Sequence, residues 1–136
     1  MSKAIPTIQK YMTTVPYSIG ADETLAAASK LMDRHNVRHL PVLEGDELLG
    51  VLTDRDLKFV ETFQDVDPST LTVAEAMIEK PYSVGPDAPL DDVASTMASE
   101  KYGSAIVVQN HKVVGIFTTV DACRALAELL STRLQK

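Results

Sequence analysis

The chain has 136 residues, 45% hydrophobic and 24% charged, with a single cysteine, which is the composition of a globular domain and not of a disordered or disulfide-rich secreted chain. No apolar run approaches the ~20 residues that cross a bilayer and no leader-like segment opens the sequence, so we expect a cytoplasmic protein without a membrane partner. The net charge of −6 disfavours broad binding to nucleic acid.

The sequence contains one pattern twice. Thr7–Asp56 aligns with Thr72–Asp121 without a gap, and both segments carry the tripeptide Pro-Tyr-Ser, at residues 16–18 and 81–83. Such internal similarity indicates a tandem duplication. We therefore predict a first repeat over residues 1–63, a linker over 64–71 and a second repeat over 72–136. Because a half of this size buries only about 60% of its surface, we expect the two repeats to share one core.

Each repeat opens with the same elements. Thr7 and Thr72 begin short helices, and the glutamate three residues after Thr72 gives capping-box spacing. Short extended segments are predicted over 17–19 and 82–84. Helices are then predicted over 24–36 and 89–101, with Asp22 and Asp87 suited to cap their N-termini.

Two strands and a helix complete each repeat. Apolar, largely β-branched runs predict strands over 40–43 and 48–52, and over 105–108 and 113–117, joined by the turn signals Gly-Asp and Asn-His. Helices are predicted to begin at Thr53 and Thr118. The order helix–strand–helix–strand–strand–helix makes each repeat an α/β (α+β) unit.

No pattern in the sequence is typical of an enzyme. The histidines His35, His39 and His111 occupy unrelated positions, and Cys123 falls inside a predicted helix. Motifs that hold zinc, activate a serine or cradle phosphates, such as HExxH, GxSxG and GxxxxGK[ST], do not occur. We therefore expect a chain without catalytic residues and without a metal site.

Both repeats end in Gly-apolar-apolar-Thr-x-x-Asp, from Gly50 to Asp56 and from Gly115 to Asp121. One interpretation is functional: the threonine and the helix N-terminus bind a phosphate, and the carboxylate accepts hydrogen bonds from a ribose diol. The other interpretation is structural, because Thr-x-x-Asp has capping-box spacing. The two roles compete for the same carboxylate, and the spacing by itself favours the cap.

Two further groups of side chains are candidates for ligand contacts. Arg38, His39 and Arg55 form either a cationic group for an anion or an ordinary solvated surface. The equivalent positions of the second repeat carry Gly, Ser and Val, so the basic residues are confined to the first repeat. Tyr17 and Tyr82 are either stacking surfaces for a base or residues at the edge of the core.

Together these features resemble a known family. The opening Met-x-x-x-Pro-x-x-Val/Ile at 12–19 and 77–84, the Arg-His-Leu-Pro-Val turn at 38–42 and the two Thr-x-x-Asp endings resemble a tandem pair of cystathionine-β-synthase (CBS) domains, a Bateman module. The resemblance extends from about Thr7 to the final helix. It implies two pseudo-symmetric repeats packed through their sheets, in a stand-alone module that forms a disc-like homodimer.

The resemblance also implies a function. Many CBS pairs bind AMP, ADP, ATP or S-adenosylmethionine in clefts between the repeats and report its level to a regulated partner protein, as in energy sensing. No other cofactor, no nucleic acid and no catalysis is implied. The first cleft would use Arg38, His39, Thr53, Asp54, Arg55, Asp56, Lys80, Pro81, Tyr82, Tyr102 and Gly103. The second would use Thr14, Pro16, Tyr17, Val37, Arg38, Thr118, Thr119 and Asp121.

Two classes of function follow from these interpretations. With the family in view, ligand contact becomes the favoured role of the Thr-x-x-Asp motifs, and the expected function is a nucleotide-sensing regulatory module. The alternative is a ligand-free dimerisation or assembly domain in which the same motifs only cap helices.

Overall fold

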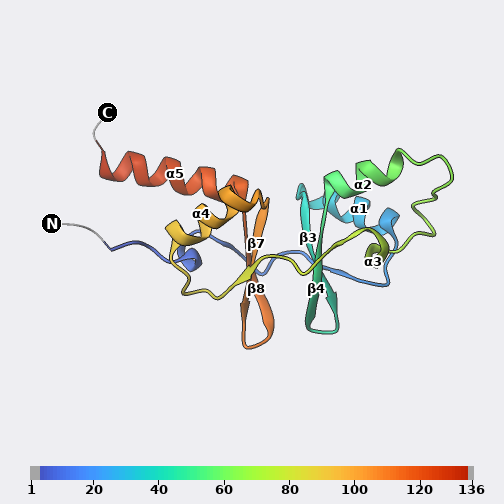
Figure 1. The fold of residues 1–136 in the computed structure, drawn as a ribbon, viewed down its shortest axis with the longest axis horizontal. Helices are drawn as coiled ribbons and strands as arrows, with labels where there is room; N and C mark the ends of the chain where they lie inside the picture. Colours follow the sequence, from blue (N-terminus) through green and yellow to red (C-terminus); the bar gives the residue numbers. More distant parts are fainter. Residues whose placement is uncertain (1–3, 135–136) are drawn as a thin grey trace. The chain divides into compact units, whose positions relative to one another are not determined.

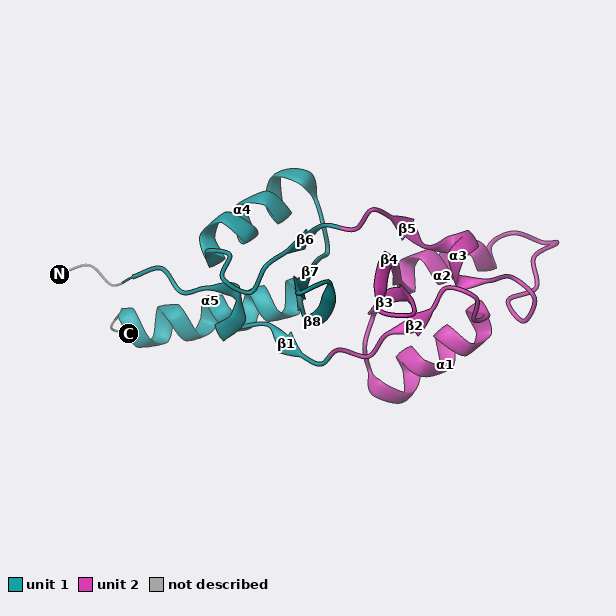
Figure 2. Cartoon of the chain, turned by 90° about the horizontal axis from the view of Figure 1, so that it is seen from below, with its two compact units in different colours: residues 1–15, 82–136 teal, residues 16–81 magenta. Residues whose placement is uncertain are grey.

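The computed structural model describes residues 4–134 (Figure 1). The ends of the two predicted repeats, residues 1–3 and 135–136, lie outside the described residues. The chain forms two compact units: residues 16–81 make unit 2, and residues 1–15 together with 82–136 make unit 1 (Figure 2). Each unit contains a four-stranded sheet, in agreement with the predicted α/β class.

Unit 2 is built on the first repeat. Its elements are β2 (Ile19–Gly20), α1 (Leu25–His35), β3 (His39–Glu44), β4 (Glu47–Thr53), α2 (Asp54–Glu61), α3 (Val73–Ala76) and β5 (Ile78–Glu79). The strands follow the order β2-β3-β4-β5, with β2 parallel to β3 and the other pairs antiparallel.

Unit 1 repeats this plan. Its elements are η1 (Ile8–Lys10), β1 (Thr13–Thr14), β6 (Ser83–Val84), α4 (Leu90–Glu100), β7 (Ser104–Gln109), β8 (Lys112–Thr118) and α5 (Thr119–Arg133). Its sheet follows the order β1-β8-β7-β6, with β6 parallel to β7. The predicted hairpins and main helices are confirmed, whereas the two-residue strands β1 and β5 were not predicted.

The compact units and the sequence repeats divide the chain differently. β1, from the first repeat, pairs with β8 of the second, and β5, from the second repeat, pairs with β4 of the first. The segment expected to be a linker also belongs to unit 2, where the Leu71 carbonyl accepts a hydrogen bond from the Leu25 amide at 2.9 Å. Each unit therefore contains an opening segment that belongs, by sequence, to the other repeat.

The hydrophobic core differs from the single shared core that we expected. Each unit has its own cluster of buried side chains. The cluster of unit 2 joins α1, β3, β4 and α2, and includes Val73 from the second repeat. The cluster of unit 1 joins α4, β7, β8 and α5, and includes Ile8 from the first repeat. Because the opening segments are exchanged, both repeats contribute to both clusters.

The caps of the two central helices correct another prediction. Asp22 and Asp87 are not N-caps, because each lies in the turn that precedes its helix. The N-cap of α1 is Thr24, whose hydroxyl accepts a hydrogen bond from the Ala27 amide at 3.1 Å, and the N-cap of α4 is Pro89. The chain stays extended through both N-cap residues, so each helix begins three residues after the aspartate.

Candidate functional site

Two stretches singled out in the first repeat meet at one end of the β3–β4 hairpin. His39 at the start of β3 pairs with Thr53 at the end of β4. The Asp54 amide donates a hydrogen bond to the Arg38 carbonyl at 3.0 Å, which closes this end of the hairpin. Together with the first turn of α2, these residues form a group that we call the Asp56 site, comprising Arg38, His39, Thr53, Asp54, Arg55 and Asp56.

Within this site, Asp56 caps α2. Its Oδ2 accepts a hydrogen bond from the Thr53 amide at 2.9 Å, and the Thr53 hydroxyl accepts one from the Asp56 amide at 3.1 Å. This reciprocal arrangement is a complete capping box. The structural interpretation of Thr-x-x-Asp is therefore realised. It uses one carboxylate oxygen, and Oδ1 has no hydrogen bond or ion pair with any residue in the range 4–134.

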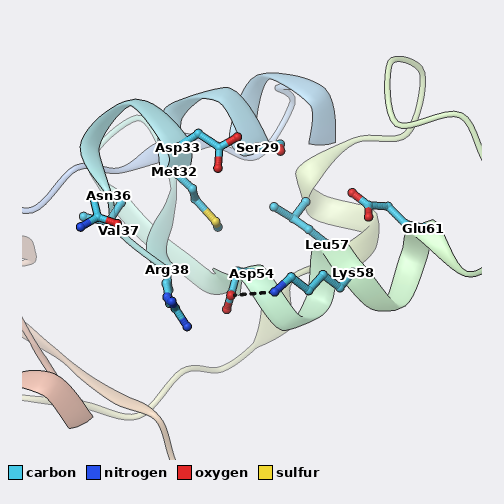
Figure 3. A pocket seen from close by; sticks show the side chains of 10 residues that line it. All are labelled: Ser29, Met32, Asp33, Asn36, Val37, Arg38, Asp54, Leu57, Lys58 and Glu61. Atoms are coloured by element: carbon cyan, nitrogen blue, oxygen red, sulfur yellow. Dashed lines mark ion pairs between the residues drawn. The ribbon is translucent and has the colours of Figure 1, made fainter.

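The charges around Asp56 are unevenly paired. Asp54 forms an ion pair with Lys58 at 3.7 Å, one turn further along α2 (Figure 3). The side chains of Arg38 and Arg55 are exposed, and neither makes an ion pair within the described part of the chain. A guanidinium group with unused donors is suited to bind phosphate or carboxylate. The site thus offers an available carboxylate oxygen and two available cations.

A cavity of about 310 Å³ adjoins this group, between the C-terminal part of α1 and α2 (Figure 3). Among its lining residues are Asp33, Val37, Arg38, Asp54, Leu57 and Lys58. Thr53 and Asp56 do not line it. The cavity therefore overlaps the predicted ligand residues only at Val37, Arg38 and Asp54, and the capping carboxylate lies outside it.

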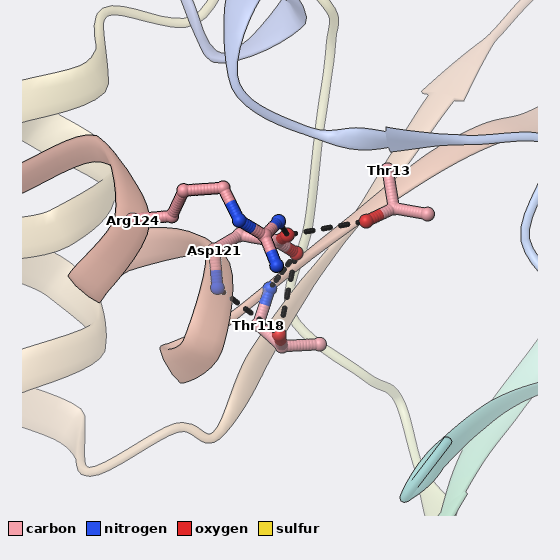
Figure 4. A network of polar contacts seen from close by, with 4 residues as sticks. All are labelled: Thr13, Thr118, Asp121 and Arg124. Atoms are coloured by element: carbon pink, nitrogen blue, oxygen red, sulfur yellow. Dashed lines mark hydrogen bonds and ion pairs between the residues drawn. The ribbon is translucent and has the colours of Figure 1, made fainter. Parts of the chain in front are cut away.

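The equivalent group in unit 1 is more tightly bonded (Figure 4). We call it the Asp121 site; it comprises Thr13, Thr118, Asp121 and Arg124. Asp121 is buried, with 4% of its surface exposed. Its Oδ2 accepts hydrogen bonds from the Thr118 amide at 2.9 Å and the Thr118 hydroxyl at 3.2 Å. Its Oδ1 accepts hydrogen bonds from the Thr13 hydroxyl at 3.1 Å and from Arg124 at 3.0 Å.

Two of these partners were missed from the sequence. Arg124 lies three residues after Asp121 on the same helix, a spacing at which side chains meet, so the pattern contained a usable signal. Thr13 lies 108 residues from Asp121 and reaches it only because β1 pairs with β8. No local pattern marks that contact.

The predicted tyrosines, Tyr17 and Tyr82, occupy equivalent positions in the two repeats, and each stacks on another ring of its own unit. Tyr17 stacks on His35, with ring centroids 3.7 Å apart and 12° between the planes. Tyr82 stacks on Tyr102 with centroids 5.2 Å apart. Tyr82 also packs against the core of unit 1, as expected for a core-edge residue. Tyr17 and Tyr102 stay 49% and 42% exposed, so each keeps ring surface accessible to a planar ligand.

The residues predicted for each cleft belong to both units. In the first set, Tyr82, Tyr102 and Gly103 lie in unit 1 and the others in unit 2; in the second set, Thr14, Thr118, Thr119 and Asp121 lie in unit 1 and Pro16, Tyr17, Val37 and Arg38 in unit 2. Within unit 1, Thr14 follows Thr13 in β1, and the Thr119 amide donates to the Gly103 carbonyl at 3.2 Å. The joining of the two parts of each set remains a prediction.

No group of three or more His, Cys, Asp or Glu side chains within residues 4–134 is arranged to hold a metal ion. Over the same residues, no helix combines the length and the apolar character that crossing a membrane requires.

Comparison with known proteins adds an independent line of evidence. The family model described as CBS domain matches twice, at residues 8–60 and 73–128. Hypoxic response protein 1 of Mycobacterium tuberculosis is 33% identical over 111 residues, which cover 81% of this chain and 78% of that protein. The CBS domain-containing protein YhcV of Bacillus subtilis is 33% identical over 114 residues, covering 84% of this chain and 81% of that protein.

A solved structure has the same fold over most of both chains. It is the CBS domain pair of protein MJ0100 in complex with 5′-methylthioadenosine and S-adenosyl-L-methionine. The TM-score is 0.83 at 25% sequence identity, and the match covers 92% of this chain and 98% of that chain.

Proposed function

The chain belongs to the CBS domain family, and from that premise we propose that it is a regulatory, non-catalytic module that binds an adenosine-containing ligand and reports it to a partner protein. The similar CBS pair of MJ0100, crystallised with two such ligands, supports this class of ligand. AMP, ADP, ATP and S-adenosylmethionine all carry the adenosine group and are the candidates.

The observation that carries the proposal is the half-used carboxylate of Asp56. A carboxylate accepts up to four hydrogen bonds, whereas Asp56 accepts one from the residues that the structure describes, donated by the Thr53 amide. Its Oδ1 is free to accept hydrogen bonds from the two hydroxyls of a ribose without breaking the capping box. Under this proposal the cap and the ligand contact do not compete, since Oδ2 serves the Thr53 amide and Oδ1 would serve the ribose.

We assign the phosphate to side chains and not to the N-terminus of α2. The Asp54 amide is occupied by the Arg38 carbonyl, and the Asp56 amide by the Thr53 hydroxyl. Arg55 directly precedes Asp56, and Arg38 is held at the start of α2 by the hydrogen bond from the Asp54 amide; both are exposed and supply the guanidinium donors that suit phosphate. The positions of unit 1 that are equivalent to Arg38 and Arg55 carry Gly103 and Val120, so we propose the Asp56 site as the primary one.

The adenine wall is proposed from the family resemblance. For the Asp56 site it comprises Lys80, Pro81, Tyr82, Tyr102 and Gly103. The stacked pair of Tyr82 and Tyr102 supports this part of the proposal, because an exposed aromatic face binds a purine ring by stacking. His39 and Thr53 would complete the polar contacts.

Titration calorimetry and thermal unfolding with AMP, ADP, ATP and S-adenosylmethionine test the proposal, on protein first freed of bound nucleotide. A ligand at 100 times its dissociation constant adds about 2.7 kcal/mol to the free energy of unfolding, a rise of several degrees in melting temperature. Asp56→Asn keeps an oxygen for the Thr53 amide and removes the charge; we expect at least a tenfold loss of affinity. Asp46→Asn, in the exposed β3–β4 turn, is the matched control.

A second candidate function rests on exposed apolar side chains. Phe59 on α2 is 64% exposed and packs edge-on against Phe63 one turn later. Leu126, Leu130 and Leu134, spaced four residues apart along and just beyond α5, are 49–62% exposed. Apolar side chains at helical spacing suit a helix-mediated interface, and we propose a second copy of this chain as the occupant.

The ligand-sensing function and the assembly function predict different results in thermal unfolding and light scattering. If the protein is only an assembly domain, no nucleotide changes its melting temperature at millimolar concentration, while Phe59→Glu and Leu126→Glu shift its mass in light scattering from dimer to monomer. Glu128→Gln, at an exposed position of the same α5 helix, is the control and keeps the wild-type mass. A wild-type chain that is monomeric at micromolar concentration would contradict the dimer.

A further inference from the structure

We infer that the chain carries one working ribose site, at Asp56, and that Asp121 is a structural carboxylate that does not bind ligand. The inference rests on the proposed function and narrows it, because the family resemblance implies two equivalent positions. It follows from the different hydrogen-bond donors that contact the two duplicated aspartates.

The hydrogen-bond capacity of Asp121 is already used. Its two oxygens accept four hydrogen bonds, from the Thr118 amide, the Thr118 hydroxyl, the Thr13 hydroxyl and the Arg124 guanidinium. Four is the full capacity of a carboxylate. One of these bonds joins two charged groups, which makes it stronger than a bond to a neutral hydroxyl. To bind Asp121, a ribose would have to displace existing donors and reach a residue that is only 4% exposed.

A sequence difference between the repeats explains why Asp56 does not accept the additional hydrogen bonds. The two extra donors to Asp121 are Thr13 and Arg124. At the same offset of 65 residues that aligns the repeats, their counterparts in unit 2 are Ile78 and Phe59. Neither side chain has a hydrogen-bond donor. Asp56 therefore retains the capping box common to both repeats and lacks the second pair of bonds.

The bonds to Asp121 have a structural consequence of their own. Thr13 belongs to β1, which enters unit 1 from the far end of the sequence and pairs with β8 over only two residues. The hydrogen bond from Thr13 to Asp121 adds a side-chain tie between that short strand and α5. Asp121 thus adds one side-chain bond to those that hold the exchanged N-terminal segment, and Asp56 has no equivalent partner within residues 4–134.

Titration calorimetry with AMP and 2′-deoxy-AMP on the full chain tests the inference. We expect one AMP per chain, and weaker binding of 2′-deoxy-AMP, which lacks one of the two ribose hydroxyls. In Asp56→Asn, AMP binding weakens at least tenfold and the preference for AMP over 2′-deoxy-AMP disappears. In Asp121→Asn, affinity, stoichiometry and preference stay within twofold of wild type, while the melting temperature falls.

Further variants keep the test decisive if Asp121→Asn does not fold. Thr13→Val and Arg124→Leu each remove one donor and are expected to leave AMP binding unchanged. Conversely, Ile78→Thr combined with Phe59→Arg supplies Asp56 with the donors that hold Asp121, and is expected to weaken AMP binding at least tenfold.

The possible failures are distinguishable. If none of AMP, ADP, ATP and S-adenosylmethionine binds the wild-type chain, the proposed function is wrong and the inference falls with it. If AMP binds at two per chain, or if Asp121→Asn abolishes the preference for the ribose diol, the function stands and the inference is overturned.

Discussion

Replacement of Gly50 by alanine tests how the exchanged segment is held. Gly50 lies in β4 and pairs with Glu79 of β5. A Cβ atom built on Gly50 would lie 2.5 Å from the Ile78 carbonyl oxygen and 2.8 Å from the Met77 sulfur. The equivalent glycine of unit 1, Gly115, offers a matched comparison, because the three atoms nearest to its Cβ would all belong to the Met12 side chain, with the sulfur at 2.5 Å.

The expected free-energy change is a balance of two terms. Neither glycine has a left-handed backbone, so alanine by itself would stabilise each site by about 0.4–1 kcal/mol through the unfolded state. Overpacking costs about 1–3 kcal/mol, and more when the obstacle is rigid. At Gly50 the obstacle is a backbone carbonyl, so β5 must move away from β4 and weaken its two residue pairs. At Gly115 the flexible thioether of Met12 can change rotamer instead.

We therefore expect Gly50→Ala to lower the free energy of unfolding by about 2 kcal/mol, and Gly115→Ala by less than ~1 kcal/mol. In a chain of this length the first change lowers the melting temperature by about 6–10 °C. Urea and thermal unfolding followed by circular dichroism measure both values. A Gly50→Ala protein as stable as wild type, or a Gly115→Ala protein that loses as much as Gly50→Ala, would refute the distinction between a rigid and a flexible neighbour.

Three further changes probe single interactions. Tyr11→Phe removes a buried hydroxyl that has no partner within the described residues, so the free energy of unfolding should rise by about 1 kcal/mol in urea denaturation; a fall would contradict this. Val15→Gly should also raise the free energy of unfolding, by about 1 kcal/mol, because this exposed β-branched residue has φ of 47° and the strain that glycine relieves exceeds its entropic cost. Lys80 has a similar φ of 54° but is unbranched, so Lys80→Gly should gain less in the same assay. Hydrogen bonds from the Ser69 hydroxyl and, to a lesser extent, the Ser69 amide lower the pKa of Asp67. The stabilisation by this carboxylate is therefore present above its ordinary pKa and is lost as pH falls through the lowered pKa. Ser69→Ala should raise the Asp67 pKa in an NMR titration, and an unchanged pKa would count against the role of the hydroxyl.

Local features of the fold could be predicted because their causes lie within a few residues. The main hairpins follow from apolar runs and turn residues, and α2 and α5 begin where Thr53 and Thr118 cap them. The capping boxes were one of two interpretations of the Thr-x-x-Asp motif, and the structure contains a capping box at both Asp56 and Asp121. The start of α1 was predicted at residue 24, one residue before its observed start at Leu25, and its cap is Thr24 and not Asp22.

The exchange of opening segments had no comparable signal. β1 and β5 contain two residues each, too few for an alternating pattern, and the strands they pair with lie far away in the sequence. Which open edge of which hairpin a short segment joins depends on the packing of whole units. For the same reason the sequence could not show that each core contains a residue from the other repeat.

The candidate site illustrates both levels. Its residue types, their duplication and the capping of each aspartate are encoded locally and could be listed from the sequence. The difference between Asp56 and Asp121 depends on Thr13, which comes within hydrogen-bond distance of Asp121 only after the chain has folded. A carboxylate is available for a ligand when its oxygens lack donors, and the donors that reach it are set by long-range strand pairing as well as by the motif that contains it.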